Sequence, residues 1–206
     1  MIAVVDYGAG NLRSVTNALG ELGYQGSVTR EPECVRKAHA VVFPGVGAAG
    51  DTMRSISKSG MAQAIRTRIA EGLPLLAVCV GMQVLFSRTE EGGWHECLDI
   101  VPGVVKRLPS GLKVPHIGWN QVRQHIDHPI FDGVPDNANF YFVHSYHGYP
   151  ENGEGVAGTT DYGLSMCSVL VMGNLVATQF HPEKSSELGL RIYANFFKMA
   201  GVHRQG

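Results

Sequence analysis

Cys79 is the residue whose type and surroundings favour chemistry most clearly. Residues 75–78 form a continuous apolar run of the kind that makes a strand buried on both faces, and a helical pattern follows them. Gly81 lacks a Cβ, so the start of that helix can pass close under the strand. Helical N–H groups would then face the sulfur and favour a thiolate and a neighbouring oxyanion. The pattern predicts a nucleophile elbow with cysteine in place of serine, and a small buried core cysteine is the alternative.

A cysteine nucleophile needs an imidazole base, and that ring needs an acceptor on its other nitrogen. Among nine histidines, His181 directly follows the apolar run 175–180. Pro182 disfavours helix at His181, which would hold the ring at a strand end. Glu183 stands two residues further on as an orienting carboxylate. We therefore predict a Cys79–His181–Glu183 triad, with a capping turn that carries surface His and Glu side chains as the alternative.

The remaining cysteines and histidines give little sign of a metal site. The four cysteines lie far apart, without a C-x-x-C pair, so neither a disulfide framework nor a zinc site is indicated. The spacing of His144 and His147 resembles that of two metal-ligating histidines, but no further ligands accompany them. We expect no metal.

The elements that must position the triad read as a parallel sheet. Apolar or β-branched strands alternate with helical patterns, which implies right-handed crossovers and helices on both faces. The expected strands are residues 2–5, 25–30, 40–43 and 75–78, and a helix is expected over residues 61–71. Residues 44–47 (Pro-Gly-Val-Gly) break the third strand and can present bare N–H groups at the sheet edge where Cys79 lies. An ordinary βα loop is the alternative there.

The second half of the chain predicts short strands and turns. The expected strands cover residues 101–108, 113–119, 140–146, 166–171 and 175–180, with a hairpin turn at residues 173–174. A final helix carries one apolar stripe between residues 192 and 200, with Ser185 or Ser186 as its cap. The expected fold is α/β, one domain over residues 1–206, with a mostly parallel central sheet flanked by helices and an antiparallel extension.

Composition restricts the class of partner. The chain has 206 residues, a net charge of -1 and 17% charged residues, so it lacks the basic excess that nucleic acid or anionic lipid would require. Met1 runs directly into a strand, and no apolar run is long enough to span a bilayer, so we expect a cytoplasmic protein. Residues 6–11 suggest a dinucleotide-binding turn, but the third glycine and the later acidic residue are missing. A tight turn that lines a shared cleft is the favoured interpretation.

Six segments together resemble one family. They are Asp6-Tyr7-Gly8-Ala9-Gly10-Asn11, Pro44-Gly45-Val46-Gly47, Cys79-Val80-Gly81-Met82-Gln83, Pro115-His116-Ile117-Gly118-Trp119-Asn120, Tyr141-Phe142-Val143-His144-Ser145-Tyr146 and His181-Pro182-Glu183. In this order they resemble the class I (triad) glutamine amidotransferases, and more narrowly the glutaminase subunits of imidazole glycerol phosphate synthases. The resemblance covers nearly the whole chain. It departs at Val80, where leucine is more common, and at Ala49, where an aromatic residue is common.

The resemblance implies a glutaminase with no cofactor. Cys79 would attack the side-chain amide of L-glutamine, and His181 would protonate the departing ammonia and later activate water. The N–H of Val80 and one from Gly45, Val46 or Gly47 would hold the oxyanion. The remaining family positions that would hold the substrate are Gln83, Ser145 and Tyr146.

The resemblance also implies a partner, a separate (β/α)8 barrel cyclase subunit that receives the ammonia. Its interface would include Asn11, His116, Trp119 and Lys184, although simple core packing is the alternative for Trp119. Two glycines flank Val46, so the Gly45–Val46 peptide could point either its C=O or its N–H into the site and act as a switch. Other functions left open are a glutaminase for a different synthase, a cysteine hydrolase or peptidase on the same fold, and a non-catalytic binding module.

Overall fold

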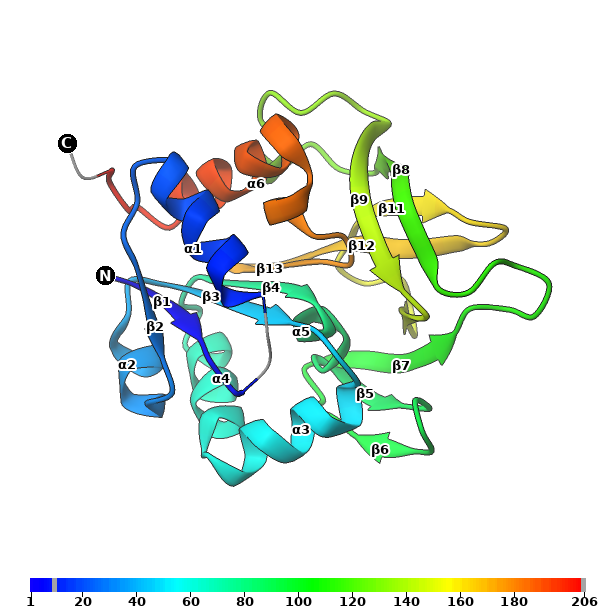
Figure 1. Ribbon diagram of the computed structural model, residues 1–206, viewed down its shortest axis with the longest axis horizontal. Helices are drawn as coiled ribbons and strands as arrows, with labels where there is room; N and C mark the ends of the chain where they lie inside the picture. Colours follow the sequence, from blue (N-terminus) through cyan, green and yellow to red (C-terminus); the bar gives the residue numbers. More distant parts are fainter. Residues whose placement is uncertain (9–10, 205–206) are drawn as a thin grey trace.

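The computed structural model describes residues 1–8 and 11–204, and a nine-stranded mixed sheet runs through it in the order β2-β1-β3-β4-β13-β12-β11-β8-β9 (Figure 1). Its first five strands are parallel. They are β2 (Gly26–Thr29), β1 (Ile2–Val5), β3 (Ala40–Gly45), β4 (Leu75–Cys79) and β13 (Leu175–Thr178). Every residue of β1, β3, β4 and β13 is buried, as expected for strands covered on both faces. The predicted parallel sheet is confirmed.

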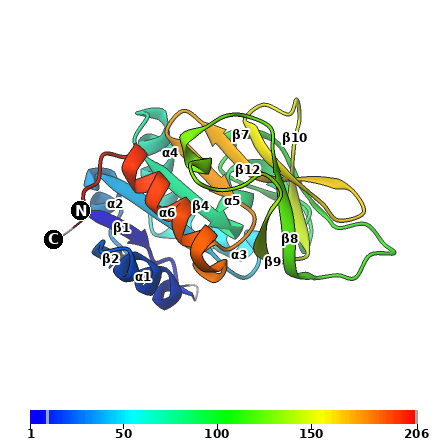
Figure 2. The same cartoon turned by 90° about the horizontal axis from the view of Figure 1, so that it is seen from above.

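Helices cover both faces of the parallel strands. α1 (Leu12–Glu21) and α6 (Ser186–Met199) lie above the sheet in Figure 1 and in front of it in Figure 2. On the other face lie α2 (Pro32–Lys37), α3 (Ala49–Lys58) and α4 (Met61–Ala70). The predicted helix over residues 61–71 is confirmed within one residue, whereas the sequence analysis identified neither α2 nor α3.

An antiparallel region completes the molecule. β12 (Ser165–Met172), β11 (Val156–Asp161), β8 (His116–Gln124) and β9 (Ala138–His144) extend the main sheet, and each pairs antiparallel with its neighbour. A second, four-stranded sheet has the order β10-β7-β5-β6. Its strands are β5 (Phe86–Thr89), β6 (His95–Glu96), β7 (Val101–Arg107) and β10 (Tyr146–Pro150). Two short helical turns, α5 (Val80–Gln83) and η1 (Pro129–Phe131), connect strands, and a third, η2 (Pro182–Lys184), joins β13 to α6.

Several predicted boundaries in this region are wrong. The strand expected over residues 113–119 begins at His116 and continues to Gln124. The strand expected over residues 140–146 is two strands, because β9 ends at His144 and β10 starts at Tyr146 in the other sheet. The sequence analysis also missed β5, β6 and β11. The hairpin expected at residues 173–174 is present, since Met172 pairs with Leu175.

Two predictions at element ends need correction. β3 does not stop at Phe43, because Pro44 and Gly45 still pair with Val78 and Cys79 of β4. Ser185 precedes α6 as predicted, but its side chain does not cap the helix. Its hydroxyl instead donates to the His181 carbonyl oxygen at 2.7 Å and accepts from the Tyr141 N–H at 2.9 Å. Ser185 therefore fixes the segment that carries His181.

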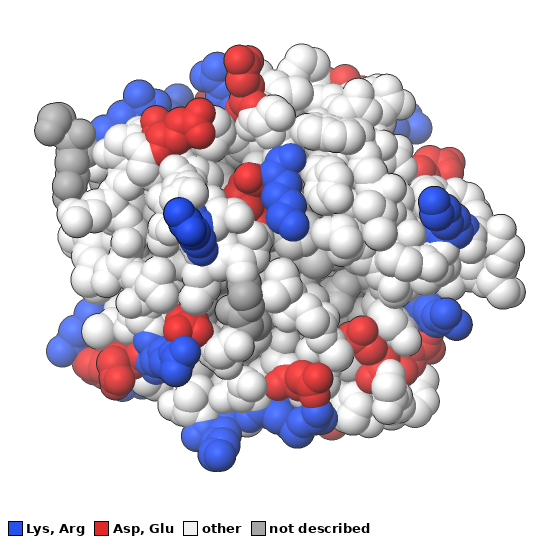
Figure 3. Space-filling model, viewed as in Figure 1, with Lys and Arg blue, Asp and Glu red and all other residues white. Residues whose placement is uncertain are grey.

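The surface carries charges of both signs. Acidic and basic side chains are interspersed over the face in Figure 3, in keeping with the net charge of -1. Within residues 1–8 and 11–204, no helix has the combined length and apolar character needed to cross a membrane.

Candidate active site

The chain turns sharply at Cys79, between the end of β4 and the start of α5. Cys79 has φ 55° and ψ -110°, a conformation that L-residues rarely adopt and that functional sites often hold under strain. α5 passes so close to β3 that a Cβ on Gly81 would lie 2.3 Å from the Phe43 carbonyl oxygen. A Cβ on Gly45 would lie 2.2 Å from the Gly81 nitrogen. The predicted strand-to-helix turn is confirmed, although its helix is a single turn.

His181 and Glu183 form a buried pair beside this turn. The His181 Nδ1–H donates to Glu183 Oε1 at 2.7 Å, and the two side chains are 2% and 0% exposed. Asn11 Nδ2 donates to the same carboxylate oxygen, and the Tyr193 hydroxyl donates to the other at 3.4 Å. The His181 N–H is bonded to the Tyr141 carbonyl oxygen at 2.9 Å. A surface capping turn is therefore the wrong interpretation of this segment.

The charge state of His181 is set by its neighbours. Burial opposes the charged ring, but the negative charges of Cys79 and Glu183 and their hydrogen bonds outweigh it and raise the pKa of His181 to about 10. Glu183 holds the proton on Nδ1, which leaves Nε2 to exchange a proton with a reacting group. Cys79 and His181 line the same cavity. The arrangement suits a thiolate–imidazolium pair.

The cavity that Cys79 and His181 line has a volume of about 360 Å³. Predicted site residues that line it are Cys79, His181, Val46, Gly47, Val80, Gln83, Ser145, Tyr146 and Lys184. Gly45 does not line it, because Gly45 packs against the backbone of residues 80–81. The sequence analysis did not assign four other lining residues to the site, namely Glu91, Pro115, Val143 and His144. Two of them, Glu91 and His144, are ionisable, and Glu91 Oε2 accepts the Ala49 N–H at 2.7 Å.

The Val46 N–H, one of the predicted oxyanion donors, is bonded elsewhere. It donates to the Tyr7 hydroxyl at 3.2 Å. Burial raises the pKa of Tyr7, so this hydroxyl keeps its proton at neutral pH. The Tyr7 ring packs edge-on against Phe43 of β3, with ring centroids 5.8 Å apart. Tyr7 belongs to the glycine-rich turn noted in the sequence, of which Ala9 and Gly10 lie outside the described residues.

Two buried glutamines contact each other here, and one of them, Gln83, lines the cavity. Gln83 Nε2 donates to the Tyr146 carbonyl oxygen at 2.7 Å and to Gln179 Oε1 at 3.1 Å. Gln179 Nε2 in turn lies 3.6 Å from Cys79 Sγ. Gln179 was not predicted from the sequence, because its contact with Cys79 spans 100 positions of the chain. Since the Gln83 hydrogens are engaged, the contact that Gln83 can offer a ligand is its Oε1 acceptor.

The residues predicted for the partner interface divide into two groups. Trp119 is 53% exposed and shares one face of β8 with Ile117, which is 57% exposed, so core packing is the wrong interpretation of Trp119. Tyr141 joins them, with Trp119 packed edge-on against it and the Lys184 ammonium 5.9 Å above its ring. We call these four residues the β8–β9 patch.

The other two residues predicted for the interface, His116 and Asn11, are buried or partly buried. His116 is only 3% exposed, because its ring stacks between Phe142 and Tyr162. It can support the β8–β9 patch but offers no contact surface, which corrects the prediction. Asn11 is partly buried and is bonded to Glu183.

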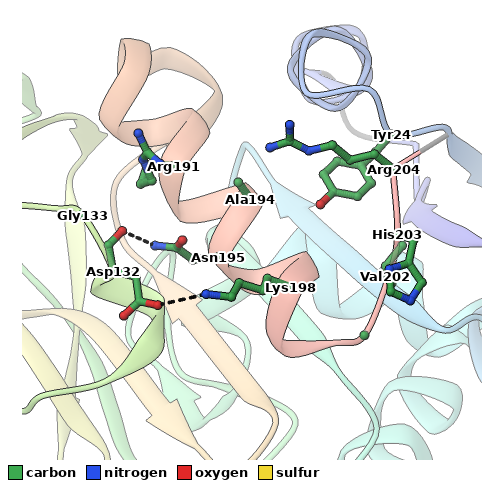
Figure 4. A pocket seen from close by; sticks show the side chains of 11 residues that line it. Tyr24, Asp132, Gly133, Arg191, Ala194, Asn195, Lys198, Val202, His203 and Arg204 are labelled. Atoms are coloured by element: carbon green, nitrogen blue, oxygen red, sulfur yellow. Dashed lines mark hydrogen bonds and ion pairs between the residues drawn. The ribbon is translucent and has the colours of Figure 1, made fainter. Parts of the chain in front are cut away.

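A larger cavity of about 530 Å³ lies away from Cys79, beside the C-terminal half of α6 (Figure 4). In it Lys198 reaches Asp132 at 3.4 Å, and Asn195 donates to the Asp132 carbonyl oxygen at 2.9 Å. None of the described residues that line it is a cysteine, so we assign the chemistry to the smaller cavity. Across residues 1–8 and 11–204, no three His, Cys, Asp or Glu side chains are grouped as metal ligands.

Comparison with known proteins agrees with this geometry. The family model for glutamine amidotransferase class-I matches residues 3–200. Imidazole glycerol phosphate synthase subunit HisH of Dehalococcoides mccartyi (strain CBDB1) is 54% identical over 200 residues, covering 97% of this chain and 98% of the relative. The subunit of the same name from Moorella thermoacetica is 51% identical, covering 95% of this chain and 93% of the relative.

Solved structures share the fold at low sequence identity. A glutamine amidotransferase crystal structure aligns with a TM-score of 0.77 at 20% identity, over 98% of this chain and all of that chain. PurLQS from Thermotoga maritima aligns with a TM-score of 0.76 at 16% identity, over 96% of this chain and 97% of that chain. Fold, family model and relatives agree: the chain belongs to the class I glutamine amidotransferases and, within them, to the family of imidazole glycerol phosphate synthase HisH subunits.

Proposed function

We propose that this chain hydrolyses L-glutamine at Cys79 and delivers the ammonia to a separate cyclase subunit of imidazole glycerol phosphate synthase. The observation that carries the proposal is that His181, paired with the buried Glu183, lines the same cavity as a strained cysteine, Cys79. The family of the chain supports the substrate and the partner, since its relatives are named as subunits of that synthase.

The reaction follows from the charges at the site. The Cys79 thiolate attacks the amide carbon of glutamine, and the carbonyl π electrons move to oxygen. His181 gives its Nε2 proton to the leaving nitrogen, so that ammonia departs and a γ-glutamyl thioester remains. The now neutral His181 takes a proton from water, the hydroxide adds to the thioester, and glutamate leaves with the thiolate restored. Glu183 orients the ring throughout and exchanges no proton.

Groups at the cavity wall suit the charged end of glutamine. Glu91 is held by the Ala49 N–H, and its carboxylate can accept hydrogen bonds from an α-ammonium group. Lys184 supplies a cation at the same cavity for an α-carboxylate. Ser145 and Tyr146 form another part of the wall. Glu91 and Lys184 suit the α-ammonium and α-carboxylate of a small zwitterion such as L-glutamine.

The cyclase subunit would dock on the β8–β9 patch. Exposed apolar side chains gathered on one strand pair often mark a protein interface, and aromatic residues are enriched there. The patch lies beside the cavity, since Lys184 belongs to both. Ammonia would pass into a (β/α)8 barrel partner, which would form imidazole glycerol phosphate and an aminoimidazole carboxamide ribotide.

Docking would also switch the chain on. While the Val46 N–H donates to Tyr7, it cannot hold an oxyanion, and a missing donor of this type costs about 10²–10³ in turnover. Gly47, at φ +92° with open space around it, can absorb a rotation of the neighbouring peptide. A β-branched residue at Gly45 is a poor probe of this switch, because its Cβ would collide with the backbone of residues 80–81.

Reconstitution with the cyclase subunit tests the proposal. Wild-type chain plus cyclase should form imidazole glycerol phosphate from either glutamine or ammonium salts. Cys79→Ala should retain only the ammonium-dependent reaction, and Cys34→Ala, which changes a cysteine on α2 far along the chain, should retain both. A Cys79→Ala complex that still uses glutamine would disprove the proposed chemistry. A wild-type complex that hydrolyses glutamine but never feeds the cyclase would disprove the proposed partner.

A further inference from the structure

The sulfur of Cys79 has a second polar neighbour besides His181. Gln179 follows the last residue of β13, is fully buried, and places its Nε2 3.6 Å from Cys79 Sγ. That distance lies within the hydrogen-bond range for a sulfur acceptor. The chain bends at residues 179–180, directly after β13, so Gln179 and His181 both come from the short segment that follows this strand.

The hydrogen-bond network fixes which end of the Gln179 amide faces the sulfur. The Tyr146 carbonyl oxygen can only accept, so the Gln83 atom 2.7 Å from it must be the nitrogen. That nitrogen also lies 3.1 Å from the Gln179 side chain, which must then present its oxygen there. The Gln179 nitrogen is thereby directed at Cys79, and the orientation follows from donor and acceptor chemistry alone.

The two states of the sulfur have different partners. A protonated thiol can donate to the Val143 carbonyl oxygen, 4.0 Å away, whereas a thiolate can only accept. Cys79 is 3% exposed, so the protein must supply most of the donors that a thiolate needs. Hydrogen bonds to an ionised group are shorter and stronger than those between neutral groups. Gln179 therefore favours the thiolate, which is the attacking species and also the leaving group of the thioester.

We propose that Gln179 is a further catalytic residue, one that stabilises the Cys79 thiolate by a direct N–H···S hydrogen bond while Gln83 keeps its amide in the required orientation. The role rests on the proposed function of Cys79 as nucleophile. It also assigns Gln83 a positioning task that is separate from any contact with glutamine.

The pH dependence of alkylation tests this role without any turnover of glutamine. Iodoacetamide reacts with the thiolate, so its rate at Cys79, followed by mass spectrometry of the isolated chain, reports the midpoint pH of thiolate formation. Gln179→Met keeps a similar shape without a donor, and Gln179→Glu, when ionised, keeps the shape with acceptors only and adds a negative charge. Both should move the midpoint up by about one pH unit, which lowers the rate below the midpoint about tenfold.

Controls separate this role from damage to the fold. Thr178→Val changes the preceding buried residue, whose hydroxyl donates to the Phe180 carbonyl oxygen, and should leave the midpoint unchanged. Thermal unfolding of each variant shows whether the chain is folded when alkylated. An unchanged midpoint in folded Gln179→Met and Gln179→Glu would overturn the inference. Failure of the wild-type complex to use glutamine would instead count against the proposed function, whatever the alkylation result.

Discussion

The two ends of β4 bury polar groups in opposite ways. At its amino end, Arg68 of α4 is fully buried, and its guanidinium donates to main-chain carbonyl oxygens around the start of β3 and β4. Three of these acceptors are Val35 at 3.0 Å, Ala38 at 2.8 Å and Pro74 at 3.1 Å. At the carboxyl end lies Cys79, in a strained conformation and next to a cavity.

The difference separates stability from chemistry. The planar Arg68 guanidinium donates several hydrogen bonds to main-chain carbonyl oxygens, and these bonds hold α2, α4 and the starts of two strands together. Around Cys79 the polar groups are held in place but a cavity is left for a substrate, in keeping with the general rule that ligands bind at the carboxyl ends of parallel strands. Substitutions at the two ends should therefore affect different measurements.

The largest effect is expected at the carboxyl end. Cys79→Ala should lower glutamine-dependent synthesis by more than about 10³-fold, because no nucleophile remains. Ammonium-dependent synthesis should be unchanged, and the free energy of unfolding should stay within about 1 kcal/mol of wild type. Steady-state assays and urea unfolding check the two halves. If a folded Cys79→Ala complex lost both syntheses to the same extent, the claim that Cys79 acts only on glutamine would be wrong.

At the amino end, Arg68→Met should show the reverse pattern. The carbonyl oxygens left without donors should cost about 3 kcal/mol or more in the free energy of unfolding. Turnover of glutamine per folded complex should stay near wild type. Arg54→Met, on an exposed ion pair of α3, is the matched control and should change stability by less than about 0.5 kcal/mol. An Arg68→Met chain that is stable but inactive would contradict the division.

A smaller effect is expected on folding stability at low pH. Burial lowers the pKa of His144 to about 3, from an ordinary value of 6.5. Below pH 6.5, His144 becomes protonated in the unfolded chain but stays neutral in the folded chain. The contribution of neutral His144 to the free energy of unfolding is therefore fully present above pH 6.5, and it is lost at about 1.4 kcal/mol per pH unit as the pH falls further. Arg68 exchanges no proton in this range.

Replacement of His144 should reduce the pH dependence of the free energy of unfolding. Unfolding free energies at pH 7 and pH 5 should differ less in His144→Gln than in wild type, whereas His203→Gln, at an exposed position, should behave as wild type. An identical pH dependence in all three chains would show that the acid sensitivity lies elsewhere.

The smallest effect is expected at Tyr7. Tyr7→Phe removes the acceptor that holds the Val46 N–H, so the isolated chain should hydrolyse glutamine about 2–10 times faster. The fully activated complex should be unaffected, which reduces the activation factor. Tyr149→Phe, at a 54% exposed ring, is the control. Slower hydrolysis by the isolated Tyr7→Phe chain would mean that Tyr7 supports the active peptide orientation instead.

The sequence predicted β1, β3 and β4 well because each starts as an unbroken run of apolar residues. It predicted β8 poorly, since His116–Gln124 alternates buried and exposed positions with few apolar residues to mark its ends. Residues 140–146 look like one apolar strand, and nothing in their types shows that the chain changes sheets at Ser145.

Residues at the site divide in the same way. Cys79, His181 and Glu183 were predictable because each stands at a recognisable turn or strand end. Tyr7 and Gln179 were not, because their roles depend on contacts with residues 39 and 100 positions away. Arg68 ran against expectation, since an arginine on a helix is usually exposed and becomes buried only where many acceptors converge.

The identity of the nucleophile is the central claim, and affinity labelling tests it most directly. An analogue of glutamine with a chloroketone in place of the amide should alkylate the attacking sulfur in the complex with the cyclase. We predict that peptide mass spectrometry finds one label, on Cys79, that glutamine protects this site, and that labelling and loss of glutaminase activity proceed at the same rate. A label on Cys34, Cys97 or Cys167 that tracks the loss of activity, with Cys79 unmodified, would contradict the account.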